Sequence, residues 1–326
     1  MGKLRGKLVL LYALALASFS LDARAQATPG SGFEVVTPFV SGQDIPESVT
    51  TDDAGNLYFS VGNSIRRRAP SGEVSEFATL PLPIFALGVK VGPDGCVYNA
   101  STSLSEVAGA FVWRACSVGS IEVFAELDAS GGPNDLAFDE RGDLYVTDPV
   151  LGRVWRIDPA GNVEIFAESP LFAGNPSDPA LVFRPVGVNG IAFDRYQHFL
   201  YLSNTDQGTI LRMGMCAHNT SPTVFVQSPL LRGADGIAFD RSGGLFVAVN
   251  AQDALVSVSP SRSVSLLAQG SPLDAPSSVV FGATRADRHQ LYVMSSAFSR
   301  TLGFQPGTPA PALLSRSVWT PGLRLP

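Results

Sequence analysis

One phrase recurs six times along this chain, and it constrains the fold more than any other feature of the sequence. Each copy is a short apolar run, a turn containing Asp or Gly, and a second run that ends in Leu-Tyr-Val or a close relative. Two such runs joined by a tight turn predict a β-hairpin. The spacing of the copies is typical of propeller blades. The clearest copies are Pro133–Thr147, Val188–Ser203 and Ala234–Ala248, and weaker ones begin at Pro46, Ala86 and Pro276.

Further apolar runs after the hairpins predict a third and a fourth strand in each unit. Arg153–Ile157 and Thr209–Met213 are examples of third strands. Fourth strands are predicted after five of the copies, at Glu73–Ala78, Ile121–Glu126, Val163–Glu168, Thr223–Gln227 and Val264–Gln269. The sequence therefore predicts an all-β fold, a six-bladed β-propeller with four-stranded blades.

The last copy is not followed by an obvious fourth strand. Phe33–Val40, just before the first copy, has the same apolar character. We expect this N-terminal strand to fill the gap and close the ring, because closure removes an exposed sheet edge. In the alternative arrangement, Pro311–Val318 completes the last blade and the N-terminal run lies elsewhere. A solenoid is disfavoured because no copy resembles a capping repeat.

The N-terminus predicts a signal peptide. A basic start precedes the apolar run Leu8–Leu21, and Ala23–Ala25 supplies the small residues that a signal peptidase needs before Gln26. The run is too short to favour a membrane span, although an uncleaved anchor is an alternative. We expect residues 1–25 to be removed, and residues 26–326 to form one propeller domain that is periplasmic or secreted and not attached to a membrane.

Charge and composition limit the partners. The formal net charge is −6, so the chain has no basic excess of the kind that binds phosphate backbones, and nucleic acid is not an expected partner. We expect a monomer that acts on a small molecule.

Export permits disulfides, and the chain has three cysteines. Cys96 and Cys116 flank a predicted hairpin and face each other in its register, which predicts a disulfide. The alternative is a pair of reduced core thiols, because cross-strand geometry is often poor for a disulfide. Cys216 remains, and we expect it to be a small buried hydrophobic residue.

Alignment of the copies places six residues at one position, the start of each innermost strand. In a propeller these starts surround the central channel on one face. The six residues are Glu47, Leu87, Asn134, Asn189, Asp235 and Ser277. We expect Leu87 and Ser277 to contact substrate, and the other four to offer oxygen atoms.

Two carboxylates and two amide carbonyls around a narrow channel favour a bound cation. Hard oxygen ligands suit Ca²⁺ or another divalent ion, whereas Zn²⁺ prefers His or Cys. The three histidines share no repeat position, which disfavours a zinc site and a Ser-His-Asp triad. Asn189 and Asp235 could each be turn formers, but four oxygen-bearing residues at one repeat position favour a metal site. Asp135 either holds its loop or supports the ligands from outside.

These phrases resemble those of the senescence-marker-protein, gluconolactonase and luciferin-regenerating-enzyme family, which is also similar to diisopropylfluorophosphatase. The resemblance is carried by Pro46–Ser48, Pro133–Asp139, Asn189–Asp194 and Asp235–Asp240. It implies a six-bladed propeller with one catalytic divalent ion, usually Ca²⁺, bound by Glu47, Asn189 and Asp235. Asn134 matches a residue that is a ligand in some members and a substrate or water contact in others.

One departure concerns the substrate. Sugar-lactone members of that family carry an Arg two residues before the Asn of the third blade, and this chain has Gly132 there. The resemblance therefore implies a hydrolase more firmly than it implies a sugar-acid substrate.

The residues and the resemblance together predict a metal-dependent lactonase or esterase. The ion would polarise the substrate carbonyl, Asp235 would orient or deprotonate the attacking water, and Asn134 would take part in positioning. Two alternatives remain open. The propeller could be a non-catalytic binding module with a structural ion, or a metal-free synthase-like propeller that uses Glu47 as a base.

The loops that lead into the innermost strands are expected to share a face with those between second and third strands, and to form the channel mouth. The longest of them, Ser169–Val188, carries Phe172 and Phe183 as predicted substrate contacts. Arg184 is the charged group placed to meet a carboxylate or phosphoryl oxygen. An apolar loop of this length predicts a substrate more apolar than a sugar lactone. In the alternative, its side chains pack against the propeller rim.

Overall fold

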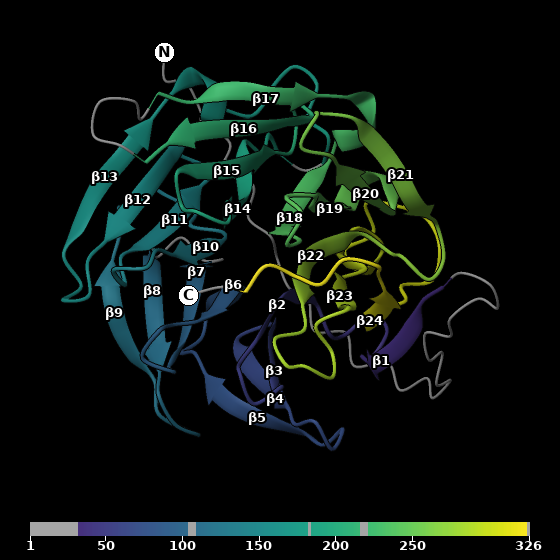
Figure 1. The fold of residues 1–326 in the computed structure, drawn as a ribbon. Coiled ribbons are helices and arrows are strands. Elements are labelled where there is room, and N and C mark those ends of the chain that lie inside the picture. Colours follow the sequence, from purple (N-terminus) through teal and green to yellow (C-terminus); the bar gives the residue numbers. More distant parts are fainter. Residues whose placement is uncertain (1–31, 104–108, 182–183, 216–220, 325–326) are drawn as a thin grey trace, which may run out of the picture.

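Six four-stranded antiparallel sheets surround a common axis in the computed structural model of the protein (Figure 1). The structure describes residues 32–103, 109–181, 184–215 and 221–324. The predicted signal peptide and Cys216 therefore lie outside the described residues. The six-bladed propeller predicted from the repeats is confirmed.

Each blade runs from an innermost strand at the axis to an outermost strand at the rim. Blade 1 contains β2 (Pro46–Thr51), β3 (Leu57–Val61), β4 (Ser64–Arg68) and β5 (Val74–Thr79). Blade 2 contains β6 (Ile84–Val91), β7 (Val97–Ser103), β8 (Ala110–Ala115) and β9 (Glu122–Glu126). Blade 3 contains β10 (Leu136–Phe138), β11 (Leu144–Asp148), β12 (Arg153–Ile157) and β13 (Val163–Glu168).

The second half of the ring follows the same order. Blade 4 contains β14 (Val188–Phe193), β15 (Phe199–Asn204), β16 (Thr209–Gly214) and β17 (Thr223–Gln227). Blade 5 contains β18 (Ala234–Phe239), β19 (Leu245–Val249), β20 (Ala254–Val258) and β21 (Val264–Gln269). Blade 6 contains β22 (Pro276–Phe281), β23 (Gln290–Ser295), β24 (Ala312–Ser317) and β1 (Glu34–Pro38).

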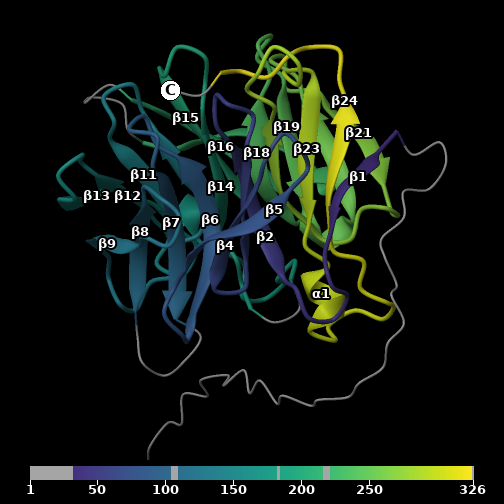
Figure 2. The same cartoon turned by 90° about the horizontal axis from the view of Figure 1, so that it is seen from below.

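Blade 6 is built from both ends of the chain. The N-terminal strand β1 pairs antiparallel with β24, with Val35 opposite Leu314 and Pro38 opposite Ala312 (Figure 2). The predicted closure by the N-terminal strand is therefore confirmed. The segment Pro311–Val318, treated as its rival, also belongs to this blade, because it supplies the third strand that β1 covers.

Aromatic residues of the repeat hold neighbouring blades together. In blades 2, 3 and 4, the Tyr of the second strand packs edge-on against the Phe of the Ala-Phe-Asp run in the next blade. Ring centroids are 4.9 Å apart for Tyr98 and Phe138, and 5.3 Å apart for Tyr145 and Phe193. Edge-to-face pairs of buried rings add about 1 kcal/mol to the stability that comes from their burial. The repeated phrase thus encodes contacts between blades as well as the hairpin within each blade.

Helices are short. Among the described segments of the chain, one α-helix, α1 (Phe298–Thr301), follows β23, and three single-turn 3₁₀ helices occupy Pro170–Phe172, Pro229–Leu231 and Asn250–Gln252. Within the described residues, no helix has the length and apolar character needed to cross a membrane. The ends of the channel are distinguished by α1 and by the C-terminal segment, which lie at opposite faces of the disc (Figure 2).

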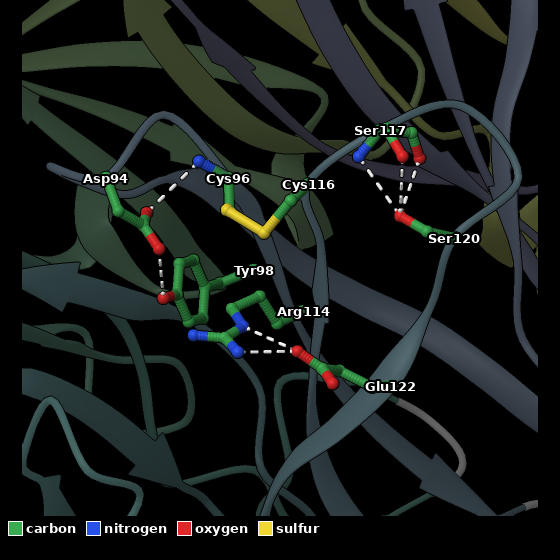
Figure 3. Close-up of a disulfide and its surroundings, with 8 residues drawn as sticks. All are labelled: Asp94, Cys96, Tyr98, Arg114, Cys116, Ser117, Ser120 and Glu122. Carbon is green, nitrogen blue, oxygen red and sulfur yellow. Dashed lines mark hydrogen bonds and ion pairs between the residues drawn. A yellow bond between two sulfur atoms is a disulfide. The ribbon is translucent and has the colours of Figure 1, made fainter.

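Blade 2 carries a disulfide between Cys96 and Cys116, at one end of its central hairpin (Figure 3). The predicted pairing is confirmed. Asp94 lies close to both sulfur atoms, but the disulfide leaves neither sulfur as a thiolate that could bind a metal. The Asp94 carboxylate instead accepts hydrogen bonds from the Cys96 backbone N–H at 3.1 Å and from the Tyr98 hydroxyl at 2.9 Å.

Removal of this disulfide should destabilise the protein. The two cysteines are 20 residues apart, and closing a loop of that size limits the unfolded chain by about 3 kcal/mol. We expect the double variant Cys96→Ala, Cys116→Ala to lose about that much free energy of unfolding in urea titrations. A reductant should lower the stability of the wild-type protein similarly and leave the variant unchanged. Equal stability of variant and wild type would contradict this assignment.

Candidate metal centre

The six residues predicted to share one position form a closed ring around the axis. Successive innermost strands are neighbours, and β22 returns to β2. Side chains and backbone groups link each position to the next. The Ser277 hydroxyl donates to the Glu47 carbonyl at 2.5 Å, and the Gly88 N–H donates to the Asn134 carbonyl at 2.8 Å. The Ser203 hydroxyl donates to the Asp235 carbonyl at 2.7 Å.

A β-bulge occurs at this position in five of the six innermost strands. In β14, for example, the register passes from the pair Val188 and Asn204 to the pair Ile191 and Leu202, so Asn189 and Gly190 face one residue. A bulge adds a residue to one strand and redirects its side chains. In four of these five strands the same irregularity places a polar side chain at the channel, and in β6 it places Leu87 there.

Glycine follows the ring residue where the bulge brings two blades together. A Cβ atom on Gly190 would overlap the backbone carbonyl of Asp235, and one on Gly236 would lie too close to the backbone of Ser277 and Ser278. Close packing between neighbouring blades therefore explains why Gly follows Asn or Asp in these copies of the repeat. The polar residue reaches the channel, and the glycine lets the neighbouring blade approach.

Three carboxyl groups meet at the channel: Glu47, Asp235 and Asp135. Burial raises the pKa of Glu47 well above its ordinary value, and the negative charges of Asp235 and Asp135 raise it further. Burial also raises the pKa of Asp235, the charge of Asp135 adds to this, and hydrogen bonds from the Asn250 side chain and the Gly236 backbone oppose it. The arrangement concentrates negative charge where little water can solvate it, which is a site that attracts a cation.

Two amide oxygens at the channel have no hydrogen-bond donor within the described part of the chain. Asn189 is buried and its Nδ2 donates to the Thr205 hydroxyl at 3.1 Å, but its Oδ1 has no partner. The Nδ2 of Asn250 lies 3.5 Å from Asp235 Oδ2, and the Oδ1 of Asn250 also lacks a partner. Buried oxygens of this kind are rare unless water or an ion completes them. Together with the carboxylates, they fit a hard divalent cation such as Ca²⁺.

Asn250 was missed by the sequence alignment because it lies at the end of β19, outside the position shared by the six copies. Only the fold brings it next to Asp235. Asn250 directly follows β19 and lies two residues beyond the end of the aligned copy at Ala248, so the alignment did not include it.

Asp135 holds its loop rather than standing as a free ligand. One carboxylate oxygen accepts the Leu136 N–H at 2.8 Å, and the other accepts the Ile191 N–H of the neighbouring blade at 3.2 Å. Burial raises the pKa of Asp135, and the positive charge of Lys90 lowers it. Asp135 therefore connects blades 3 and 4 just beside the ring. Asn134, its neighbour, is partly exposed and donates its backbone N–H to the Thr147 carbonyl at 2.8 Å.

The remaining predicted contacts divide into two groups. Leu87 and Ser277 lie in the ring, with Leu87 partly exposed and Ser277 buried. The prediction that Phe172 contacts the substrate is wrong, because Phe172 is fully buried among core residues of blades 3 and 4 and does not reach the mouth. Its burial agrees with the alternative in which the loop packs against the rim. Phe183 lies outside the described residues.

A cavity of about 630 Å³ lies on the same face as the ring, beside blades 3 and 4. Its lining combines the turn between β11 and β12 with the loop leading into β14, as predicted for the mouth. Arg184 lines the cavity, and its pKa is lowered by burial of the guanidinium and raised by the charge of Asp148. Val150 and Leu151 supply apolar surface. The cavity adjoins the segments that carry Asn134 and Asn189.

The described histidines lie away from the ring. His198 stacks on Tyr196 in the turn before β15, and His289 contacts the Val318 carbonyl just before β23. His218 is outside the described residues.

Comparison with known proteins assigns the family. The pattern of the SMP-30/Gluconolactonase/LRE-like region matches residues 45–297, which is most of the chain. The chain belongs to this family. Membership of the SMP-30/Gluconolactonase/LRE-like family supports a lactonase-type hydrolase, and it accounts for the six-bladed fold. A comparison with curated protein sequences gave no match.

Solved structures of other members of this fold are similar over most of their length. A gluconolactonase from Xanthomonas campestris is 18% identical, with a TM-score of 0.62, and the match covers 92% of this chain and 94% of that one. A luciferin-regenerating enzyme is 16% identical, with a TM-score of 0.64, covering 90% and 98%. Regucalcin from Agrobacterium tumefaciens, a calcium-binding protein, is 18% identical, with a TM-score of 0.64, covering 90% and 95%.

Proposed function

We propose that the protein is an exported, calcium-dependent hydrolase of a lactone or ester. The observation that carries the proposal is the channel ring, where the carboxyl groups of Glu47 and Asp235, both with raised pKa values, meet two buried amide oxygens that lack donors among the described residues. Glu47, Asn134, Asn189 and Asp235 would hold the ion. The disulfide in blade 2 supports export, because disulfides persist in oxidising compartments.

The chain's own residues can position water beside this ring. When bound, Ca²⁺ supplies a Lewis acid and a charge that stabilises a developing oxyanion. Asp235 orients the attacking water and accepts its proton. Asn250 Nδ2 lies 3.5 Å from Asp235 Oδ2 and holds that carboxylate in place. The Asn189 Nδ2 donates to the Thr205 hydroxyl, and this hydrogen bond fixes the orientation of the amide. The Asn189 Oδ1 therefore faces away from Thr205.

Chelation is the experiment that separates this proposal from its alternatives. We expect purified protein to contain about one calcium per chain, to hydrolyse members of a lactone panel, and to lose turnover in EDTA. Added Ca²⁺ should restore turnover, and at a concentration one hundred times the Kd it should stabilise the fold by about 2.7 kcal/mol. Bound metal without turnover on lactones or esters would favour a binding module. Turnover that survives metal removal would favour the metal-free mechanism.

Residues beside the ring also indicate how polar the substrate is. Gly132 stands where sugar-lactone relatives carry Arg, and a Cβ atom there would lie 2.7 Å from Val150 Cγ2. The Gly132 N–H also donates to Asp148 Oδ1 at 3.0 Å. A long side chain at position 132 would therefore displace Val150, which now lines the cavity. We infer that the site accepts a more apolar substrate than a sugar lactone.

A series of aliphatic lactones tests this inference. We expect kcat/KM to rise with chain length by roughly fourfold per buried methylene, which corresponds to about 0.8 kcal/mol. The variant Val150→Ala should flatten the rise, because Val150 lines the cavity. Val163→Ala, at an exposed position on the outermost strand of the same blade, should leave it unchanged. If kcat/KM of the wild-type protein did not change with chain length, or if gluconolactone were preferred, the inference of an apolar substrate would be contradicted.

A further inference from the structure

A second cavity, of about 880 Å³, lies at the other end of the channel. Residues from all six innermost strands line it, including Ile191, Ile237 and Val279. These residues follow the ring position in each strand, so the cavity is axial and lies beyond the ring. Its volume is in the range of small-molecule sites. The proposed hydrolase chemistry does not use it.

Basic side chains gather around this cavity. Its lining contains five basic residues and two acidic ones. The basic residues come from four separate parts of the fold: Lys90 from blade 2, Arg241 from blade 5, Arg285 and Arg288 from blade 6, and Arg324 from the C-terminal segment. The chain as a whole has a net charge of −6, so the positive charge around this mouth is opposite in sign to the charge of the whole chain.

The two acidic residues of the lining are already engaged. Asp53 forms an ion pair with Arg324 at 2.6 Å. Asp52 accepts the backbone N–H groups of Ala54 and Asn56 at 3.0 and 2.8 Å, together with the Asn56 side-chain amide at 2.7 Å. Asp52 is thus committed to its own turn. Neither carboxylate is available to neutralise the other basic residues.

Four of the basic residues have no carboxylate within ion-pair distance in the part of the chain that the structure describes: Lys90, Arg241, Arg285 and Arg288. Asp287 stands between two of them in sequence, but its carboxylate accepts hydrogen bonds from the Thr284 backbone and hydroxyl and from the Tyr292 hydroxyl. The charge of Lys90 also acts on Asp135, whose pKa it lowers. An anion placed in the cavity would meet positive charge chiefly from Arg241, Arg285 and Arg288. Arginine is also suited to bind carboxylates through two parallel hydrogen bonds.

The C-terminal segment completes this mouth. It crosses the end of the channel in front of the innermost strands (Figure 1). Gly322 bridges to Asp240, and the Leu323 N–H donates to the Phe239 carbonyl at 2.9 Å. A side chain at Gly322 would overlap Phe281, so the segment lies directly on blade 6. Gly322 and Leu323 line the cavity and give it an apolar wall beside the charged rim.

We propose that this mouth is a second ligand site, which binds an organic anion with a short apolar body. The anionic group would lie among Arg241, Arg285 and Arg288, and the apolar body would enter the channel between the aliphatic side chains of the innermost strands. The ring at the opposite end, which carries three carboxyl groups, would repel such an anion and keep it at this mouth. The site is independent of the proposed hydrolase function.

Octanoate is a suitable probe, with octanol as its uncharged counterpart and acetate as the counterpart without an apolar body. We expect titration calorimetry on EDTA-treated protein to show saturable octanoate binding that is at least tenfold tighter than binding of either control. EDTA keeps the probe from binding through a metal in the ring. Binding should weaken as salt rises, because salt screens exposed charges. Absence of saturable octanoate binding, or equal binding of octanol, would overturn the proposal.

Charge reversal locates the site. We expect the double variant Arg285→Glu, Arg288→Glu to bind octanoate at least tenfold more weakly, and the single variant Arg241→Glu to bind it more weakly as well. Arg195→Glu is the matched control, because Arg195 is an exposed arginine in the corresponding turn of blade 4 but does not line the cavity. An equal loss in the control would show that only the overall charge matters. Thermal melting identifies any variant that fails to fold. If the double variant fails to fold, octanoate binding by Arg241→Glu tests the proposal in its place.

Discussion

The variant Asp235→Asn should lose hydrolysis by about a thousandfold and keep its fold. Asparagine has the shape of aspartate but cannot accept a proton from water, and losing a positioned general base typically costs between a hundredfold and ten-thousandfold. It also removes one of the two negative charges among the four ligands proposed to hold the ion. The measurement is kcat/KM on the best substrate of the lactone panel, together with calcium content.

Stability supplies a second readout for the same variant. Burial raises the pKa of Asp235, so in metal-free protein the ionised carboxylate destabilises the fold. For such a group, stability is greatest below the pKa of the unfolded chain and falls as pH rises towards the pKa of the folded protein. Metal-free Asp235→Asn should therefore be at least as stable as the wild-type protein at pH 7, and the two should converge near pH 3.

Glu122→Gln is the control for these measurements, because Glu122, on the outermost strand of blade 2, forms a surface ion pair with Arg114. It should change turnover little, and exposed ion pairs contribute about 1 kcal/mol at most. If Asp235→Asn turned over lactone at the wild-type rate, Asp235 would not be the residue that activates water.

Removal of the N-terminal strand should open the ring. A chain that begins at Ser41 lacks β1 and also Phe33 and Phe39, which are buried at 5% and 6% exposure. Replacing one buried Phe with a small residue costs about 3 to 5 kcal/mol, and the loss of β1 also removes its backbone hydrogen bonds with β24. We expect a loss of more than 5 kcal/mol, with aggregation through the exposed edge of β24.

A chain that begins at Gln26 is the matched control, because it keeps β1 and lacks only the predicted signal peptide. Its melting temperature is the reference for the shorter chain. The single variant Phe39→Ala should lie between the two, since it removes one core side chain and leaves β1 in place. Melting of the shorter chain within a few degrees of the control would show that β1 does not hold the ring closed.

The outer strands show how far local sequence patterns reach. Three predicted fourth strands, including Val163–Glu168, coincide with β13, β17 and β21. The predicted strand in blade 1 is shifted by one residue from β5, and the one in blade 2 begins one residue before β9. Alternation and turn residues act within a hairpin, so they can be read locally. Blade 6 was harder because its third strand follows a connection that includes α1, and its fourth strand comes from the other end of the chain.

Side chains in loops were less predictable than those in the repeat. Phe172 was predicted to meet the substrate, yet it is buried between blades 3 and 4. An apolar side chain in a long loop can face either the core or the channel mouth, and hydrophobicity alone does not distinguish them. Asn250 and the basic mouth were missed because their residues share no repeat position and come together only when the ring closes.

The sequence by itself determined the number of blades, the hairpin in each and the position that the six ring residues share, because the repeat encodes these in local residue spacing. Closure by the N-terminal strand was predicted from its apolar character and from the strand that the last blade lacked. Only the tertiary structure decided which oxygen atoms lack donors, which carboxyl groups raise one another's pKa, and which charges gather at the second mouth. The physical reason is that burial and electrostatic interaction depend on distances in space. In a closed ring, residues far apart in the chain become neighbours across one narrow channel.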